Sequence, residues 1–141
     1  MLEFPPPDFL ASLRHFVDRY EGARQRSIRS APDIFEFYAR LFGDERVSRD
    51  ARALVNAVLA YFVVPEDVLP EAEFGPFGLM DDLFVAAHCY RILRRELAPE
   101  IVPAAWIGEG DVDEMMDEVY TETRAELGKR TKEVLRMAGI G

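Results

Sequence analysis

Apolar residues recur at three- and four-residue spacing along most of the chain, which is the period of an amphipathic α-helix. Asp8 stands where it can cap the first such stretch, and Ser30, followed by proline and aspartate, opens the second. Gly43 ends the second stretch, Ser48 opens a third, and Pro65 closes it. The pattern therefore predicts three helices in the first half, over about 9–20, 31–42 and 49–64.

The second half continues the helical pattern after a long interruption. Pro65, Pro70, Gly75, Pro76 and Gly78 predict an extended Pro/Gly-containing loop between the third and fourth helices. The fourth helix, about 79–97, is apolar on most faces and is therefore expected at the centre. The last, about 111–138, is amphipathic and highly charged, and a glycine at 128 costs it about 1 kcal/mol and favours a break. Since no strand-like alternation occurs, the expected fold is all-α: a compact bundle of about five helices in a single domain, residues 1–141.

Composition narrows the class of protein. The chain has 141 residues, of which 49% are hydrophobic, enough for a substantial core. Its formal net charge of −9 disfavours nucleic acid as a partner, because phosphate binding requires a positive field. The single cysteine, Cys89, excludes an internal disulfide and fits a reducing cytoplasmic compartment. The uncharged run 54–65 is too short to span a bilayer, and the start of the chain lacks the pattern of a leader. A soluble, acidic, cytoplasmic protein is expected.

The charge is distributed unevenly. Nine acids and nine arginines balance in residues 1–60, so residues 61–141 carry the whole excess, with 17 acids against 8 bases. Arg24, Arg26 and Arg29 form a small basic cluster that can contact an anionic surface or lipid headgroups. Three arginines beside Glu21 are few against the overall charge, so peripheral membrane contact remains only an open alternative.

The segment 54–93 carries, in a fixed order, a tyrosine, two prolines, a glycine and several acids at and around the predicted loop. These residues are Tyr61, Pro65, Asp67, Pro70, Gly78, Asp81 and Asp82. In this order they resemble the YkvA-like family, a domain-of-unknown-function family of bacterial helical proteins. Glu71 stands where the family usually has aspartate, and the loop is about one residue longer than is typical. The resemblance implies a small helical module without a settled activity.

Four acidic residues flank the predicted loop: Asp67, Glu71, Asp81 and Asp82. Carboxylate oxygens are the ligands that Mg²⁺, Ca²⁺ and Mn²⁺ prefer, so convergence of these side chains would create a divalent-cation site. The alternative is structural, because acids in the first turn of a helix are stabilised by its dipole and Asp67 can close a turn. His88, seven residues after Asp81 on the same helical face, is either a core residue or a further ligand.

No pattern of a nucleophilic or phosphate-transferring enzyme is present in the sequence, since it lacks a serine elbow and a phosphate-binding glycine loop. Met115 and Met116 give the last helix an adaptable apolar stripe, which suits a partner protein or ordinary packing. We therefore predict a non-enzymatic interaction or structural module that binds protein, either itself or another chain. The alternative prediction is a divalent-cation-binding domain.

Overall fold

The computed structural model describes residues 8–64 and 74–140, and every regular element in these two stretches is a helix. This confirms the predicted all-α class. The elements are α1 (Phe9–Val17), α2 (Gln25–Arg29), α3 (Ala31–Phe42), α4 (Arg49–Val63), the 3₁₀ helix η1 (Gly75–Leu79), α6 (Met80–Glu96), α7 (Ile101–Ala105), α8 (Val112–Leu127), the 3₁₀ helix η2 (Gly128–Arg130) and α9 (Thr131–Met137).

Several helix ends lie where the sequence predicts them, and for the predicted reason. The Ser48 side chain accepts a hydrogen bond of 3.2 Å from the amide of Ala51, which caps α4. The Asp111 side chain accepts one of 3.0 Å from the amide of Glu114, which caps α8. Gly128 has a φ of 54° and breaks the last predicted helix into α8 and α9. These ends are fixed by residues within one turn of each other.

Other local predictions are wrong. Ser30 precedes α3 as expected, but its hydroxyl donates to the carbonyl of Ser27 at 2.6 Å instead of capping the helix. Asp8 occupies the N-cap position of α1 without a side-chain capping bond, and α1 ends at Val17 instead of near Tyr20. The short helices α2 and α7 lie where the sequence predicts only frayed or connecting chain.

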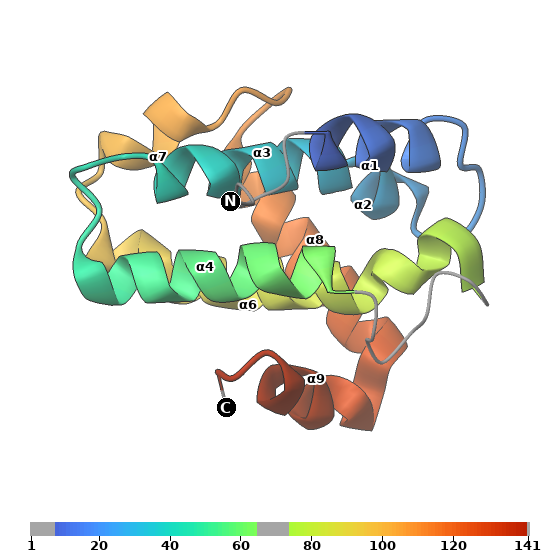
Figure 1. Cartoon of the computed structure of the whole chain (residues 1–141). Helices are drawn as coiled ribbons and strands as arrows, with labels where there is room; N and C mark the ends of the chain where they lie inside the picture. The colour runs from blue at the N-terminus through green and yellow to red at the C-terminus, as the bar shows by residue number, and fades with distance from the viewer. Residues whose placement is uncertain (1–7, 65–73, 141) are drawn as a thin grey trace.

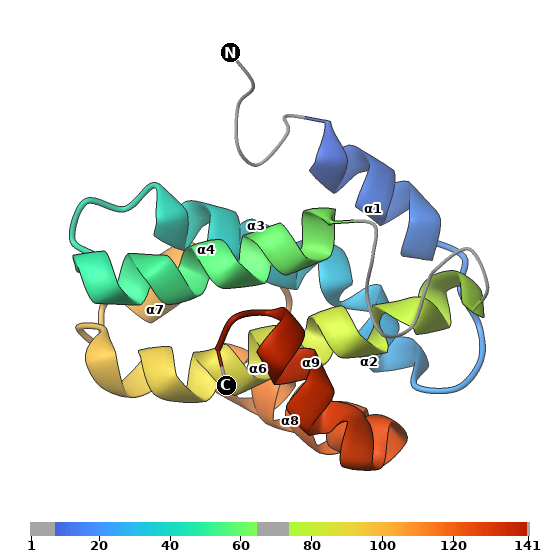
Figure 2. The same cartoon turned by 60° about the horizontal axis from the view of Figure 1, so that its bottom comes forward.

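The helix α6 is the centre of the molecule. It packs against α4 along one side and against α8 along another, while α3 packs on α4 and α1 on α3 (Figure 1). Every residue from Met80 to Ala87 is buried, which confirms the prediction of a central helix. Turning the molecule brings α9 forward, where it folds back from the end of α8 and lies against α6 (Figure 2).

The apolar stripe of α8 faces the interior. Val112, Met116, Val119 and Leu127 are all buried in the same apolar cluster as the core residues of α3, α4 and α6. Met115 is partly buried against that cluster. Of the two uses predicted for the methionine stripe, the structure shows packing, so α8 is part of the core.

Candidate functional site

The described residues of the sequence motif meet between α4 and α6. Tyr61 lies in the last turn of α4, Gly78 in η1, and Asp81 and Asp82 in the first turn of α6. The Tyr61 hydroxyl donates a hydrogen bond of 3.0 Å to Oδ2 of Asp81. Oδ1 of Asp81 accepts a bond of 3.1 Å from the amide of Asp82. The packing of α4 on α6 thus joins residues 20 positions apart into one polar cluster.

Both carboxylates of this cluster are enclosed by protein. The exposed fraction of Asp81 and of Asp82 is 0%, and that of Tyr61 is 6%. Transfer of an ionised carboxylate from water into a protein costs several kcal/mol, which surrounding dipoles, hydrogen bonds or a cation must offset. The N-terminal end of α6 and the Tyr61 hydroxyl supply part of that compensation.

Burial changes the interpretation of these acids as helix caps. The N-cap position of α6 is Leu79, and η1 runs directly into α6, so Asp81 and Asp82 lie inside a helical turn. Exposed acids would be sufficient for a favourable interaction with the helix dipole. Two fully buried neighbouring carboxylates therefore point to a more specific environment than a cap requires.

The remaining motif residues, Pro65, Asp67, Pro70 and Glu71, lie outside the described residues. Within residues 8–64 and 74–140, no group of three or more histidine, cysteine, aspartate or glutamate side chains is arranged to hold a metal ion. Of the four acids of the predicted cation site, the structure therefore describes only Asp81 and Asp82.

Two other candidate side chains are part of the packing of α6. The ring of His88 lies 5.8 Å from that of Phe84, and burial, aided by the nearby charge of Arg91, lowers the pKa of its imidazole. Cys89 is fully buried, and burial raises the pKa of its thiol to about 12. The thiol is therefore protonated and inaccessible at neutral pH, as expected of a small residue in the core.

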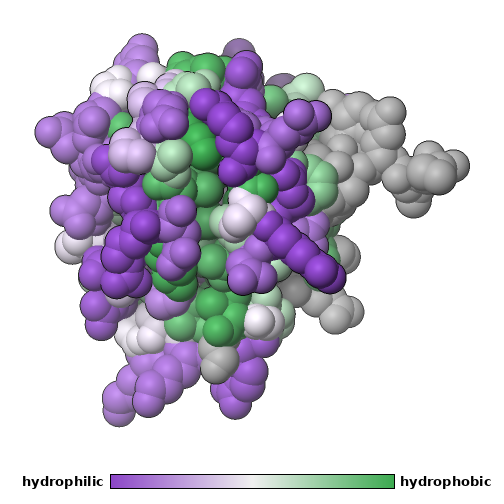
Figure 3. All heavy atoms as spheres, turned by 90° about the vertical axis from the view of Figure 1, so that its left-hand side faces the viewer, coloured by the Kyte–Doolittle hydropathy of each residue, from purple (hydrophilic) through white to green (hydrophobic). Residues whose placement is uncertain are grey.

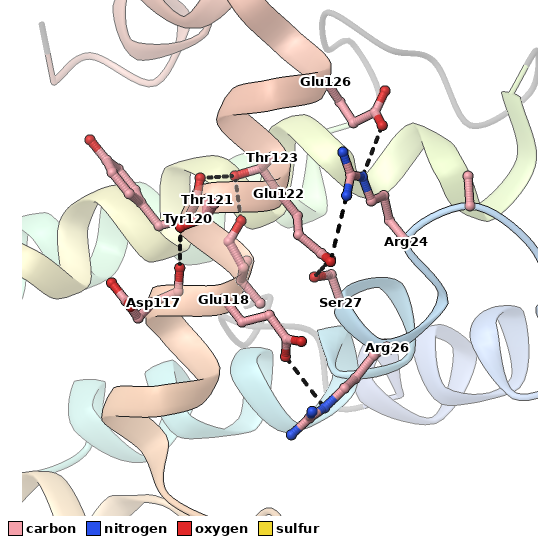
Figure 4. A network of polar contacts seen from close by, with 12 residues as sticks. Arg24, Arg26, Ser27, Asp117, Glu118, Tyr120, Thr121, Glu122, Thr123 and Glu126 are labelled. Carbon is pink, nitrogen blue, oxygen red and sulfur yellow. Dashed lines mark hydrogen bonds and ion pairs between the residues drawn. The ribbon is translucent and has the colours of Figure 1, made fainter.

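The basic cluster of the N-terminal half faces α8 instead of solvent alone (Figure 4). Nε of Arg24 lies 2.9 Å from Oε1 of Glu126, and Nη1 of Arg24 lies 3.7 Å from Oε2 of Glu122. The buried hydroxyl of Ser27 donates to Oε1 of Glu122 at 2.5 Å. One face of α8 thus holds α2 in place through polar contacts across about a hundred residues of sequence.

The other two arginines of that cluster also have partners within the chain. Nε of Arg26 lies 3.3 Å from Oε2 of Glu118, and Nε of Arg29 donates to the carbonyl of Tyr20 at 2.8 Å. The acids of α8 recur every fourth residue, which places them on one helical face. That spacing was the available signal for this contact, and the structure disfavours the cluster as a free anionic-surface site.

A surface groove of about 370 Å³ lies between α6 and α8. In it, Nε of Arg94 lies 3.0 Å from Oδ1 of Asp113, and the Tyr90 hydroxyl donates to the same oxygen. The hydrogen bond from Tyr90 is the main reason why the pKa of Asp113 is lowered. The guanidinium of Arg91 lies 4.4 Å from the centre of the Tyr120 ring. These groups satisfy one another and fasten α6 to α8.

A hydrophobic band crosses one face of the molecule. Figure 3 looks at the side where α7 and the ends of α3, α4 and α6 lie, and a hydrophobic band runs down it between two hydrophilic borders. Ile107, two residues after α7, is 51% exposed and is a large apolar side chain at the surface. Trp106 beside it is partly buried, with its indole N–H donating to the carbonyl of Gly110 at 3.2 Å. Apolar surface of this kind is typical of interaction sites.

Comparisons with known proteins match the part of the chain that contains the polar cluster of Tyr61, Asp81 and Asp82. Residues 51–87, which include Tyr61, Gly78, Asp81 and Asp82, match the model of a family described as "Protein of unknown function (DUF1232)". This supports the predicted resemblance to a domain-of-unknown-function family. The chain is also 28% identical over 124 residues to "Uncharacterized protein ORF9" of Methanothermobacter thermautotrophicus, covering 88% of this chain and 85% of that protein. No solved structure matches the chain.

The fold and the comparisons together define a helical domain of unknown function. Among the residues that the structure describes, none of the helices is long and apolar enough to cross a bilayer.

Proposed function

We propose that this chain is a non-enzymatic helical module of the YkvA-like type, a single domain that works by binding protein. The observation that carries the proposal is the apolar band of Figure 3, bordered by hydrophilic side chains. The burial of the side chains best suited to catalysis also supports a non-enzymatic role. Asp81, Asp82 and Cys89 are all at 0% exposure, where they cannot meet a substrate from solvent.

A second copy of the chain is the partner that this band fits best. Interfaces between identical subunits are more apolar than other protein contacts, and paired identical faces are the commonest arrangement of soluble oligomers. A different protein partner is the alternative. The net charge of −9 argues against a nucleic-acid partner. The single cysteine supports a reducing cytoplasmic setting.

Light scattering over micromolar to millimolar concentrations tests this proposal. We expect the mass of the wild-type chain to rise to that of a dimer, and Ile107→Glu to return it to a monomer. Met137→Glu is the matched control, because Met137 is 48% exposed on α9, a different element. A wild-type chain that stays monomeric throughout would refute self-association and leave only a different protein as partner.

The second candidate function is divalent-cation binding by Asp67, Glu71, Asp81 and Asp82. The observation that favours it is the complete burial of two adjacent carboxylates at the start of α6. Like charges in such a position repel, so a Mg²⁺, Ca²⁺ or Mn²⁺ ion beside them would stabilise the folded chain. Asp67 and Glu71 would supply further oxygen ligands from the segment that joins α4 to η1.

Thermal unfolding of the chelator-treated chain, with and without each cation, tests this candidate. A cation at about 100 times its dissociation constant adds about 2.7 kcal/mol to the free energy of unfolding. The double variant Asp81→Asn/Asp82→Asn should lose that gain, whereas the control Asp50→Asn/Glu114→Gln, which neutralises two exposed acids in other first turns, should keep it. If the double variant does not fold, Asp67→Asn and Glu71→Gln serve instead. A wild-type chain indifferent to all three cations would exclude the site.

A further inference from the structure

The break at Gly128 creates a basic hollow on an acidic protein. The hollow has a volume of about 610 Å³ and is lined by Arg124, Gly128, Lys129, Thr131 and Lys132. Arg124 comes from the end of α8, the two lysines from beyond the break. These are the only two lysines in the chain. The fold thus places three cations around one concave surface.

The lining of this hollow differs in charge from that of the other hollows described. Each of the other four is lined by at least one aspartate or glutamate, whereas no acid lines this one. Within residues 8–64 and 74–140, none of Arg124, Lys129 and Lys132 takes part in an ion pair. All three are exposed. Their charge is therefore available to a ligand.

The last acid of α8 is directed elsewhere. Glu126, two residues after Arg124, belongs to the face that contacts α2 and lies 2.9 Å from Arg24. Since two residues correspond to about 200° around an α-helix, Arg124 lies on a different side of α8. Its guanidinium lies 5.4 Å from the centre of the Tyr120 ring, a cation–π contact that helps to hold the arginine side chain in place. The ion pairs of Figure 4 thus join these carboxylates of α8 to arginines of the α2 region, and none of the carboxylates lines the hollow.

The conformation of the chain at the break requires glycine. Gly128 has a φ of 54° and a ψ of −122°, a backbone geometry that a residue with a side chain rarely adopts. A Cβ atom there would meet no heavy atom within 4 Å, so the requirement is conformational and not steric. Glycine lets the chain turn sharply enough for Lys129 and Lys132 to face the end of α8.

We propose that this hollow binds a phosphate group carrying two or more negative charges. An arginine side chain can donate two parallel hydrogen bonds to phosphate, lysine ammonium groups act as point charges, and the Thr131 hydroxyl is a further donor. The same chemistry is offered by a free phosphorylated compound and by the headgroup of an anionic lipid. Although the whole chain carries −9, charges more than about 8 Å away are largely screened at physiological ionic strength, and Glu133, the acid next to Lys132, does not line the hollow.

Titration with pyrophosphate, followed by calorimetry and by the amide resonances of residues 124–132, tests the free-ligand source. Sedimentation with vesicles of phosphatidylcholine, with and without phosphatidic acid, whose monoester phosphate can carry two negative charges, tests the headgroup. The variant Lys129→Gln/Lys132→Gln removes two cations of the hollow. The control Arg49→Gln/Arg95→Gln removes two exposed cations on other elements and keeps the same net charge as the variant.

Saturable binding of one pyrophosphate, weakened at least tenfold in the lysine variant and unchanged in the control, would support the proposal with a free ligand. Sedimentation with anionic vesicles alone, lost in the lysine variant, would support the headgroup. Both variants should unfold at the wild-type temperature, since the substituted side chains are exposed. The proposal is overturned if neither ligand binds, or if the two variants weaken binding equally.

Discussion

The hydrogen bond between Tyr61 and Asp81 is the contact of the motif whose energetic value is most directly testable. The two oxygens lie 3.0 Å apart, and the residues that carry them are 6% and 0% exposed. Because water cannot easily take the place of the hydroxyl, Tyr61→Phe removes one compensation of a buried carboxylate. Hydrogen bonds to charged groups contribute about 1.5–3 kcal/mol, so we expect the free energy of unfolding to fall by that amount.

Urea denaturation measures this loss. With a slope of about 2 kcal/mol per molar urea, the midpoint should fall by about 1 M without a change of slope. Tyr20→Phe is the matched control, since the Tyr20 hydroxyl also donates a hydrogen bond, of 2.8 Å to the carbonyl of Ala23, at an exposed site. That variant should change stability by less than about 0.5 kcal/mol.

Repeating the Tyr61→Phe substitution in an Asp81→Asn chain separates the effect of the carboxylate charge from that of ring packing. In an Asp81→Asn chain the acceptor is neutral, so the effect of Tyr61→Phe should decrease to about 1 kcal/mol. If Tyr61→Phe costs less than about 0.5 kcal/mol in the wild-type chain, the bond does not compensate the buried carboxylate and the reasoning is refuted. An equal cost in both backgrounds would assign the effect to the packing of the ring.

Three further predictions concern other parts of the fold. A Cβ atom on Gly108 would lie 2.5 Å from the indole of the single tryptophan, so Gly108→Ala should cost about 1–3 kcal/mol and alter tryptophan fluorescence; an unchanged spectrum and stability would contradict this. Glu122→Ala leaves a buried serine hydroxyl without its acceptor and should cost about 1–3 kcal/mol in urea denaturation, whereas Glu118→Ala removes a more exposed ion pair and should cost less than about 1 kcal/mol. Hydrogen bonding from Arg46 lowers the pKa of Asp44 to about 2, below the ~4 of an aspartate in an unfolded chain. The stabilisation that this contact gives the folded chain is therefore present above about pH 4 and is lost as the pH falls to about 2. Acid unfolding of Asp44→Asn should therefore show a shallower loss over that window, and a slope identical to wild type would count against the contact.

The sequence predicted what short-range interactions decide. Ser48 and Asp111 cap helices whose first amides lie only three residues away, and Gly128 breaks the last helix through its own backbone conformation. The apolar positions of α6 identified it as the central helix before its neighbours were known. These features depend on residues within about one helical turn, so reading the chain locally is sufficient to find them.

The tertiary structure alone decided which side chains meet. The sequence placed Asp81 and Asp82 at a helix start, but their complete burial and the bond to Tyr61 depend on the packing of α4 against α6. It marked Arg24 as part of a basic cluster, although its partners on α8 lie about a hundred residues further along the chain. Such contacts depend on the angles at which whole helices pack, and no local pattern specifies those angles. For the same reason the basic hollow beyond Gly128 is evident only once the chain has turned from α8 into α9 and α9 lies against α6.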